Sequence, residues 1–135
     1  MDLEFGRITI LVNDYDEAFA FYEKTLSCKK FFDLIDNGQR FLHVGLNAKD
    51  KSGIWFLKAE TDEQKKLVGN QTCGMPMMVL YTDSIDGFYE HLKNLEIKIS
   101  KELTEKEDSR FFHFVDLYGN EIVMVEMKIS IDTSN

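Results

Sequence analysis

Two short stretches of the sequence contain the residues best suited to chemistry. RFLHV at 40–44 and RFFHF at 110–114 each place a histidine after an aromatic and an apolar residue, and the second stretch begins 70 residues after the first. Imidazole nitrogens bind transition metals and exchange protons near neutral pH, so His43 and His113 are candidate metal ligands or acid–base groups. Strand histidines are more often held by hydrogen bonds or packed on aromatic rings, and both interpretations stay open here.

The elements that would position the two histidines repeat at nearly the same offset. Asp14 and Asp83, which can each begin a helix, differ by 69 positions, as do Leu26 and Leu95 on the apolar helix faces. In each half, strand patterns surround one amphipathic helix. The predicted order is strand, helix and three strands, at 5–12, 13–26, 29–35, 40–46 and 54–59, and again at 75–82, 83–95, 96–100, 110–116 and 121–127. We therefore expect an α+β fold of two tandem βαβββ modules.

The chain length and the helix signals between the halves predict one domain. A chain of 135 residues is long enough to bury a single core or two small coupled ones. Thr61 can cap a short helix and Gly69 can end it. We expect a single domain over 1–128, followed by a C-terminal tail at 129–135. Within the domain we expect module one at about 5–60, a linker helix at 61–72 and module two at about 74–128.

Charge and cysteine content exclude several classes of partner. The formal net charge of −8 is spread over many acidic residues without a basic stripe, so we expect no nucleic-acid and no membrane partner. Neither a signal peptide nor an apolar run long enough to span a bilayer is present, and we expect a cytoplasmic protein. Cys28 and Cys73 fit no zinc or redox motif, and we expect both to be reduced, buried thiols.

Two longer stretches resemble a known superfamily. ILVNDYDEAFAFYEKTL at 10–26 follows its strand–helix spacing, and DLYGNEIVMVE at 116–126 follows its last turn and strand. The chain resembles the vicinal oxygen chelate superfamily, which includes glyoxalase I, bleomycin and fosfomycin resistance proteins and extradiol dioxygenases. The resemblance implies a glyoxalase-like fold, in which each module curls into a half-cup and the two halves surround a cup-shaped cavity.

The resemblance also implies four metal-ligand positions, one from the first and one from the last strand of each module. In this chain those positions hold residues that are not usual ligands of a hard cation: Arg7, Phe56, Met77 and Val123. Glu121 lies two residues from Val123 and so points to the same strand face, but one carboxylate does not hold a catalytic metal alone. We therefore expect no metal and no cofactor.

Strand alternation predicts which side chains line the cup. Arg7, Thr9 and Leu11 would face it, whereas Trp55 would pack under a helix. An apolar pocket with a few polar groups is typical of small-molecule sites, although the same side chains could close on one another as core. Arg7 needs a partner, which could be Glu121, an anionic group of a ligand, or solvent. The candidate ligand-binding residues are Arg7, Thr9, Ile54, Phe56, Met77, Tyr81, Glu121 and Val123.

These observations favour a metal-independent protein that resembles the bleomycin-resistance branch and binds a small, partly apolar ligand in the cup. Such a protein acts by sequestration, has no catalytic residues and is expected to form a homodimer. The alternative is a glyoxalase-type lyase, isomerase or dioxygenase that uses displaced metal ligands, for which His43, His113 and Glu121 are the candidates. A protein–protein module without a small ligand is a third interpretation.

Overall fold

The computed structural model describes residues 1–47, 49 and 51–128, and the predicted tail at 129–135 lies outside them. The chain divides into two compact units, of which unit one runs from Met1 to Gln71 and unit two begins at Thr72. Each unit is built on one four-stranded sheet.

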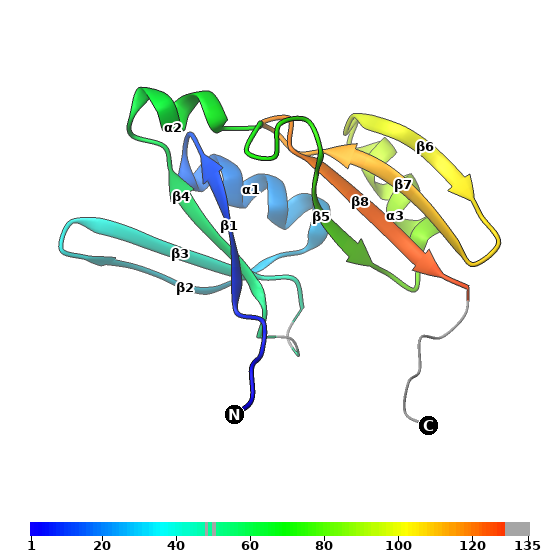
Figure 1. Cartoon of the computed structure of the whole chain (residues 1–135), viewed down its shortest axis with the longest axis horizontal. Coiled ribbons are helices and arrows are strands. Elements are labelled where there is room, and N and C mark those ends of the chain that lie inside the picture. Colours follow the sequence, from blue (N-terminus) through cyan, green and yellow to red (C-terminus); the bar gives the residue numbers. More distant parts are fainter. Residues whose placement is uncertain (48, 50, 129–135) are drawn as a thin grey trace. The chain divides into compact units, whose positions relative to one another are not determined.

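Unit one contains four strands and two helices (Figure 1). Its elements are β1 (Arg7–Val12), α1 (Tyr15–Leu26), β2 (Lys29–Asp36), β3 (Gln39–Gly45), β4 (Gly53–Lys58) and the short α2 (Asp62–Leu67). The strand order in the sheet is β1-β4-β3-β2, with β1 parallel to β4 and the other pairs antiparallel.

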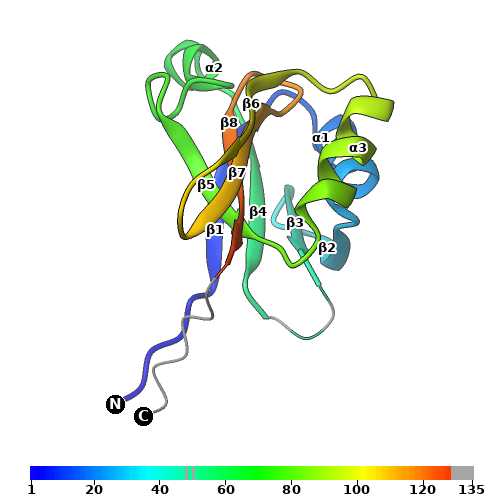
Figure 2. The same cartoon turned by 90° about the vertical axis from the view of Figure 1, so that its right-hand side faces the viewer.

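Unit two repeats this arrangement. Its elements are β5 (Pro76–Tyr81), α3 (Ile85–Asn94), β6 (Ile99–Glu105), β7 (Ser109–Val115) and β8 (Glu121–Met127), and the strand order is β5-β8-β7-β6. Figure 2 shows α3 lying along one face of this sheet. The predicted α+β fold of two βαβββ modules is therefore confirmed. Each sheet is open and not curled as predicted, because four strands alone are too few to close on themselves.

Side-chain caps explain where the helices begin. The Asp14 carboxylate accepts a hydrogen bond of 2.8 Å from the backbone N–H of Glu17, as its position before the apolar pattern predicts. Asp83, the repeat counterpart of Asp14, does not take the cap position of α3. Instead the Glu126 carboxylate on β8 accepts a bond of 3.3 Å from the N–H of Ile85, the first residue of the helix. A distant strand thus supplies the cap that local sequence does not.

The structure contains the predicted Asn-Gly turn, but one edge strand has other bounds than predicted. Asn37 and Gly38 have φ angles of 51° and 77°, as an Asn-Gly turn between two paired strands requires. The strand predicted at 96–100 instead runs from Ile99 to Glu105. This strand lies at the sheet edge, pairs with β7 through two register shifts and is mostly polar, so it lacks the alternation by which strands are recognised.

Each sheet buries one face against its own helix. In unit one, Phe56 of β4 contacts Tyr22 of α1, with ring centroids 5.5 Å apart, and both side chains are fully buried. In unit two, Phe112 of β7 packs edge-on against Tyr89 of α3 at 5.1 Å. The other fully buried apolar side chains on the described strands of the two sheets have the same parity, and they are Ile10, Val12, Leu42, Val44, Ile54, Phe114, Ile122 and Met124.

The two cysteines lie in different environments. Cys28 is fully buried, and this burial raises the pKa of its thiol to about 12. Cys73 is exposed, so the prediction that both thiols are buried is wrong for this residue, which belongs to the segment between the modules rather than to a strand. Neither cysteine forms a disulfide. Within the described part of the chain, no helix has the length and apolar character needed to cross a membrane.

A repeated ion pair joins the helix to the sheet in each unit. Arg40 of β3 binds Asp16 of α1 through two hydrogen bonds of 2.8 and 3.3 Å, and Arg110 of β7 binds Asp86 of α3 through bonds of 2.8 and 2.9 Å. Both pairs keep the 70-residue offset. Arg40 also binds Asp33 of β2 at 2.8 and 2.9 Å, and these bonds lower the pKa of the Asp33 carboxyl to about 2.

The Asp33 pair predicts a specific loss of stability in acid. Because the pKa of Asp33 is lowered in the folded chain, its stabilising effect is complete above the ordinary value of 3.8 and is lost as the pH falls toward about 2. We expect Asp33→Asn to lower the free energy of unfolding by about 1 kcal/mol at pH 7, since the pair is partly exposed. The difference from wild type should shrink between pH 4 and pH 2 in urea unfolding.

The matched control is Asp36→Asn in the same strand. Asp36 is exposed and makes no ion pair among the described residues, so its replacement should leave the acid dependence unchanged. Equal acid profiles for Asp33→Asn and wild type would contradict the assignment.

Candidate functional site

The pairing of β1 with β4 decides which side chains lie on the sheet face of unit one that points away from α1. Thr9 pairs with Trp55 and Ile10 pairs with Phe56. Since Phe56 contacts Tyr22 of α1, its neighbours in the strand point to the opposite side. We call this opposite side the open face of unit one, and it carries Arg7, Thr9, Phe41, His43 and Trp55.

The β4 residues that were predicted to line the cup are therefore off by one position. Ile54 and Phe56 are buried under α1, so the prediction that they face the cup is wrong. Trp55, which was expected to pack under a helix, lies on the open face and is half-buried there. A one-residue slip moves every side chain of a strand to the other face, and the continuous apolar run of this strand gave no alternation that could have fixed it.

A row of rings crosses the open face of unit one. The His43 ring lies between Phe32 of β2, at a centroid distance of 4.4 Å, and Trp55 of β4, at 5.1 Å. Phe41 stacks on Trp55 at 6.1 Å with an interplanar angle of 24°. The three strands β2, β3 and β4 thus present one nearly continuous aromatic surface, with Phe32 still 40% exposed.

Arg7 closes one end of this surface. Its Nε donates a hydrogen bond of 3.1 Å to Nδ1 of His43, and its Nη1 donates to the carbonyl oxygens of Gly6 at 3.0 Å and Lys51 at 2.5 Å. The guanidinium also lies over the ring of Phe31, 4.3 Å from its centroid. Of the three partners considered for Arg7, the structure thus provides an internal one, but it is a histidine and not a carboxylate.

Two glycines make room for the Phe31 ring. A Cβ atom at Gly45 would lie 2.4 Å from this ring, and one at Gly53 would lie 2.8 Å from it and 2.0 Å from the Val44 carbonyl oxygen. Any larger residue at Gly45 or Gly53 would therefore displace Phe31 and, with it, the aromatic support of Arg7.

The bond from Arg7 fixes the protonation of His43. Because Nδ1 accepts a hydrogen bond, the neutral imidazole carries its proton on Nε2. This Nε2 and the Nε1 of Trp55 are both shielded from solvent, and neither has a hydrogen-bond partner among the described residues. Desolvation and the nearby Arg7 charge lower the pKa of His43, so the neutral form is favoured.

The edge of this sheet is partly closed by a side chain. The Gln71 amide accepts a hydrogen bond of 3.0 Å from the N–H of Leu11 and donates one of 3.0 Å to the carbonyl oxygen of Thr9. Both backbone groups belong to β1, which lies at the edge of its sheet. The exposed Thr9 side chain, a predicted site residue, remains on the open face.

In unit two the histidine lies beside a carboxylate, whereas in unit one it lies beside a guanidinium. His113 Nδ1 lies 3.1 Å from Oε1 of Glu121, which also accepts a hydrogen bond of 3.1 Å from the Ser100 hydroxyl. The structure therefore brings together two of the predicted residues, His113 and Glu121. Both lie on the sheet face that points away from α3, which we call the open face of unit two.

Of the other predicted residues of unit two, Tyr81 and Val123 lie on its open face. Val79 pairs with Val123, and Tyr81 pairs with Val125, which points to the same face of β8. Tyr81 is 69% exposed. Met77 falls at a register shift between Pro76 and the next paired residue, so it is the extra residue of a bulge and has no partner on β8.

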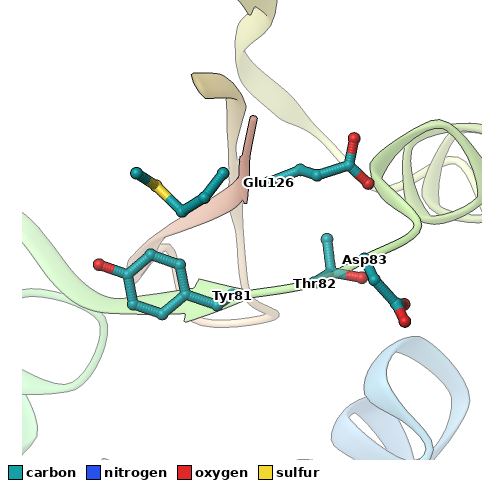
Figure 3. Close-up of a pocket in the computed structure, with 5 residues that line it drawn as sticks. Tyr81, Thr82, Asp83 and Glu126 are labelled. Carbon is teal, nitrogen blue, oxygen red and sulfur yellow. The ribbon is translucent and has the colours of Figure 1, made fainter. Parts of the chain in front are cut away.

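A shallow pocket of about 710 Å³ lies at the ends of β5 and β8 (Figure 3). Tyr81, Thr82, Asp83, Glu126 and Met127 line it. In Figure 3 the Glu126 carboxyl points toward α3, whereas the Tyr81 ring points the other way. Glu126 caps the helix and the Thr82 hydroxyl accepts from a backbone N–H, so both polar groups serve the fold.

A second pocket of about 570 Å³ lies in unit one, beside the β2–β3 turn. Its most strongly charged group, Arg40, already binds two carboxylates. Neither pocket therefore offers chemistry as distinctive as the aromatic open face of unit one.

The residues at the four positions implied for metal ligands do not fit a metal. Arg7 is a cation bonded to His43, Phe56 is buried core, and Met77 and Val123 offer no hard donor. Over residues 1–47, 49 and 51–128, no three His, Cys, Asp or Glu side chains are grouped so that they could hold an ion. No chemical step through a bound metal follows from these side chains.

Comparison with known proteins gives consistent matches. A sequence model described as Glyoxalase/Bleomycin resistance protein/Dioxygenase superfamily matches residues 4–124. An uncharacterized protein of Shewanella frigidimarina (strain NCIMB 400) is 31% identical over 119 residues, which cover 84% of this chain and 85% of that protein.

Similar solved structures cover nearly the whole chain. The crystal structure of UcmS2 has a TM-score of 0.81 at 21% identity and covers 93% of this chain and 98% of its own. TnmS3, an antibiotic binding protein from Streptomyces sp. CB03234, has a TM-score of 0.77 at 16% identity and covers 94% of this chain and 98% of its own. At these identities the two structures support the fold alone.

The Arg7–His43 pair predicts a pH dependence of stability near neutrality. Because the pKa of His43 is lowered in the folded chain, the unfolded chain binds a proton more readily, and stability falls as the pH drops below the ordinary value of 6.5. His43→Gln keeps an acceptor for Arg7 but does not titrate. We expect its melting temperature to fall less than that of wild type between pH 7.5 and pH 5.

The histidine control for this measurement is His91→Gln on the exposed side of α3. It should retain the pH dependence of wild type. An unchanged dependence in His43→Gln would show that this residue does not titrate in the folded chain as described.

Proposed function

Because the chain belongs to the glyoxalase/bleomycin resistance protein/dioxygenase superfamily, we propose that it is a small-molecule-binding protein that works without a metal or a cofactor. The observation that carries the proposal is the open face of unit one, where aromatic rings of three strands surround a few polar atoms. Small-molecule sites are typically apolar with a small number of orienting groups. Binding, and not turnover, is then the output of the protein.

The proposed contact residues follow from the two open faces. On unit one they are Arg7, Thr9, His43 and Trp55, of which the last replaces the buried Ile54 and Phe56. On unit two, Tyr81, Glu121 and Val123 offer a second surface, with Met77 at the bulge beside it.

Two findings support the proposal, of which the first concerns the metal and the second the ligand. The four positions implied for ligands hold side chains that do not suit a divalent cation. In addition, one of the structures with a similar fold is of a protein named as antibiotic binding. We propose that this chain likewise sequesters a small, partly apolar compound.

An enzyme is the second candidate, and the His113–Glu121 pair favours it. A carboxylate 3.1 Å from an imidazole nitrogen is an arrangement that can orient a general base. His43 is less suited to a metal, because its Nδ1 lone pair accepts the Arg7 hydrogen bond. Loss of a measurable turnover in His113→Gln, at an unchanged melting temperature, is the result that would establish an enzyme.

We also propose a homodimer that acts in the cytoplasm. Exposed apolar side chains are a feature of surfaces that bind partners, and both units carry them. The two free cysteines agree with a reducing compartment. The exposed apolar residues on the strands are Phe31, Phe32, Leu34, Ile35, Val79 and Tyr81.

Ligand binding without metal can be tested by a thermal-shift screen of antibiotics and metabolites on protein treated with a chelator. A ligand at about 100 times its Kd should add about 2.7 kcal/mol to the free energy of unfolding and raise the melting temperature by several degrees. Addition of nickel, zinc, manganese or iron should not enlarge the shift. Stoichiometric metal in the purified protein, or tight binding of one of these ions, would contradict the proposal.

Light scattering coupled to size-exclusion chromatography tests the dimer. We expect twice the chain mass at about 100 μM, since association depends on concentration. Leu34→Asp places a charge on an exposed apolar strand and should shift the mass toward a single chain. Wild-type protein that remains a monomer at this concentration would rule out a stable homodimer.

A further inference from the structure

We infer that the open face of unit one recognises a planar aromatic molecule through an oxygen that only accepts hydrogen bonds, a carboxylate or a conjugated carbonyl, placed at the His43 and Trp55 N–H groups. This inference rests on the proposed small-molecule binding and adds the chemical class of the ligand. The inference is carried by polar atoms of this face that lack partners among the described residues: two N–H groups have no acceptor, and the Arg7 guanidinium has no carboxylate.

Two N–H donors on neighbouring strands lack an acceptor. The rings of His43 and Trp55 lie 5.1 Å apart, and the Nε2–H of the first and the Nε1–H of the second are shielded from water without a partner among the described residues. Buried polar groups in folded proteins are nearly always hydrogen-bonded, and an unpaired one destabilises the fold. Both donors are already desolvated, so a ligand oxygen that reaches them gains hydrogen bonds without first displacing water from these two atoms.

The hydrogen bond from Arg7 determines which tautomer neutral His43 adopts. Arg7 Nε donates to Nδ1, so the remaining proton must lie on Nε2. A lowered pKa keeps the ring neutral at physiological pH. His43 therefore presents a donor, and never an acceptor, to a ligand at this position.

Arg7 gives the same region a positive charge. In the part of the chain that the structure describes, its hydrogen bonds go to His43 and to two backbone carbonyls, and it makes no ion pair with a carboxylate. The neighbouring atoms thus combine one cation with two neutral donors. Such a set selects against ammonium or hydroxyl hydrogens and favours an anionic or strongly polarised oxygen.

The aromatic row indicates the shape of the rest of the ligand. Phe41 and Trp55 are stacked with an angle of 24° between their planes, so the two rings are nearly parallel and a flat molecule can align with them next to the donors. Phe32 covers His43 from the other side but is 40% exposed, so its ring can turn outward without opening the core. A planar ring system can then lie along the row with its oxygen directed at the two N–H groups.

Unit two shows that this donor set is specific to unit one. The equivalent histidine, His113, lies next to the carboxylate of Glu121, so its polar partner is an acceptor inside the chain. At this position of the repeat, the histidine therefore has a carboxylate partner in unit two and a guanidinium partner in unit one. Recognition of an acceptor oxygen is expected at unit one alone.

Three probes of similar size test the inference. They are 2-naphthoate, which carries an anionic acceptor, 2-acetylnaphthalene, which carries a neutral carbonyl, and 2-naphthylmethylammonium, which carries donors only. Trp55 is the one tryptophan of the chain, so its fluorescence reports occupancy of the open face directly. We expect 2-naphthoate to bind roughly ten-fold tighter than the ammonium probe. The acetyl probe distinguishes charge from acceptor geometry, and it should also bind tighter than the ammonium probe.

Isothermal titration calorimetry of variants identifies the donors. Trp55→Phe keeps an aromatic ring but removes the N–H, and His43→Phe removes the second donor. Each should weaken 2-naphthoate binding by roughly five- to ten-fold while leaving the ammonium probe unchanged. His91→Gln, an exposed histidine of unit two, is the matched control and should bind 2-naphthoate like wild type.

The outcomes separate this inference from the proposed function. Equal affinity for the naphthoate and ammonium probes, or undiminished naphthoate binding in Trp55→Phe and His43→Phe, overturns the inference. So does failure of all three probes to bind when the thermal-shift screen finds a ligand of another class, and in that case the proposed function stands. If neither the probes nor the screen give a ligand, both fail together.

Discussion

The parallel pairing of β1 with β4 is the constraint on which the rest of unit one depends. With Ile10 opposite Phe56, both side chains reach the core under α1, and Thr9 and Trp55 are turned to the other side. Because the side-chain period of a strand is two, this single register assigns every residue of β4 either to packing or to the open face. The Arg7–His43 bond crosses the same strand beside Gly53, which has no side chain of its own and leaves room for the Phe31 ring.

The sequence was sufficient for the architecture but not for the details of the site. The repeat offset, the Asp14 cap and the Asn37–Gly38 turn each have a local signal, and the structure confirms the two βαβββ modules they predicted. The face of Trp55 could not be read from an unbroken apolar run. Glu126 as the cap of α3 depends on a contact 41 residues away, which no local pattern reveals.

The two units show how a duplicated module can keep its structure and change its chemistry. The arginines at 40 and 110 bind helix aspartates in the same way, and these ties hold α1 and α3 to their sheets. No local sequence pattern indicates these ion pairs, because the two partners of each pair lie 24 residues apart. The histidines at 43 and 113 also occupy equivalent places, but their partners carry opposite charge. Packing positions have thus been retained where polar partners have diverged.

The Gln71 side chain has a consequence for the behaviour of the protein in a crowded solution. An edge strand with free N–H and C=O groups is a template on which another extended chain can add, and such addition leads to aggregation. Gln71 occupies one donor and one acceptor of β1 with a side-chain amide, which imitates a neighbouring peptide group. A single side chain, four residues beyond the end of α2, therefore blocks intermolecular strand addition at this point of the edge.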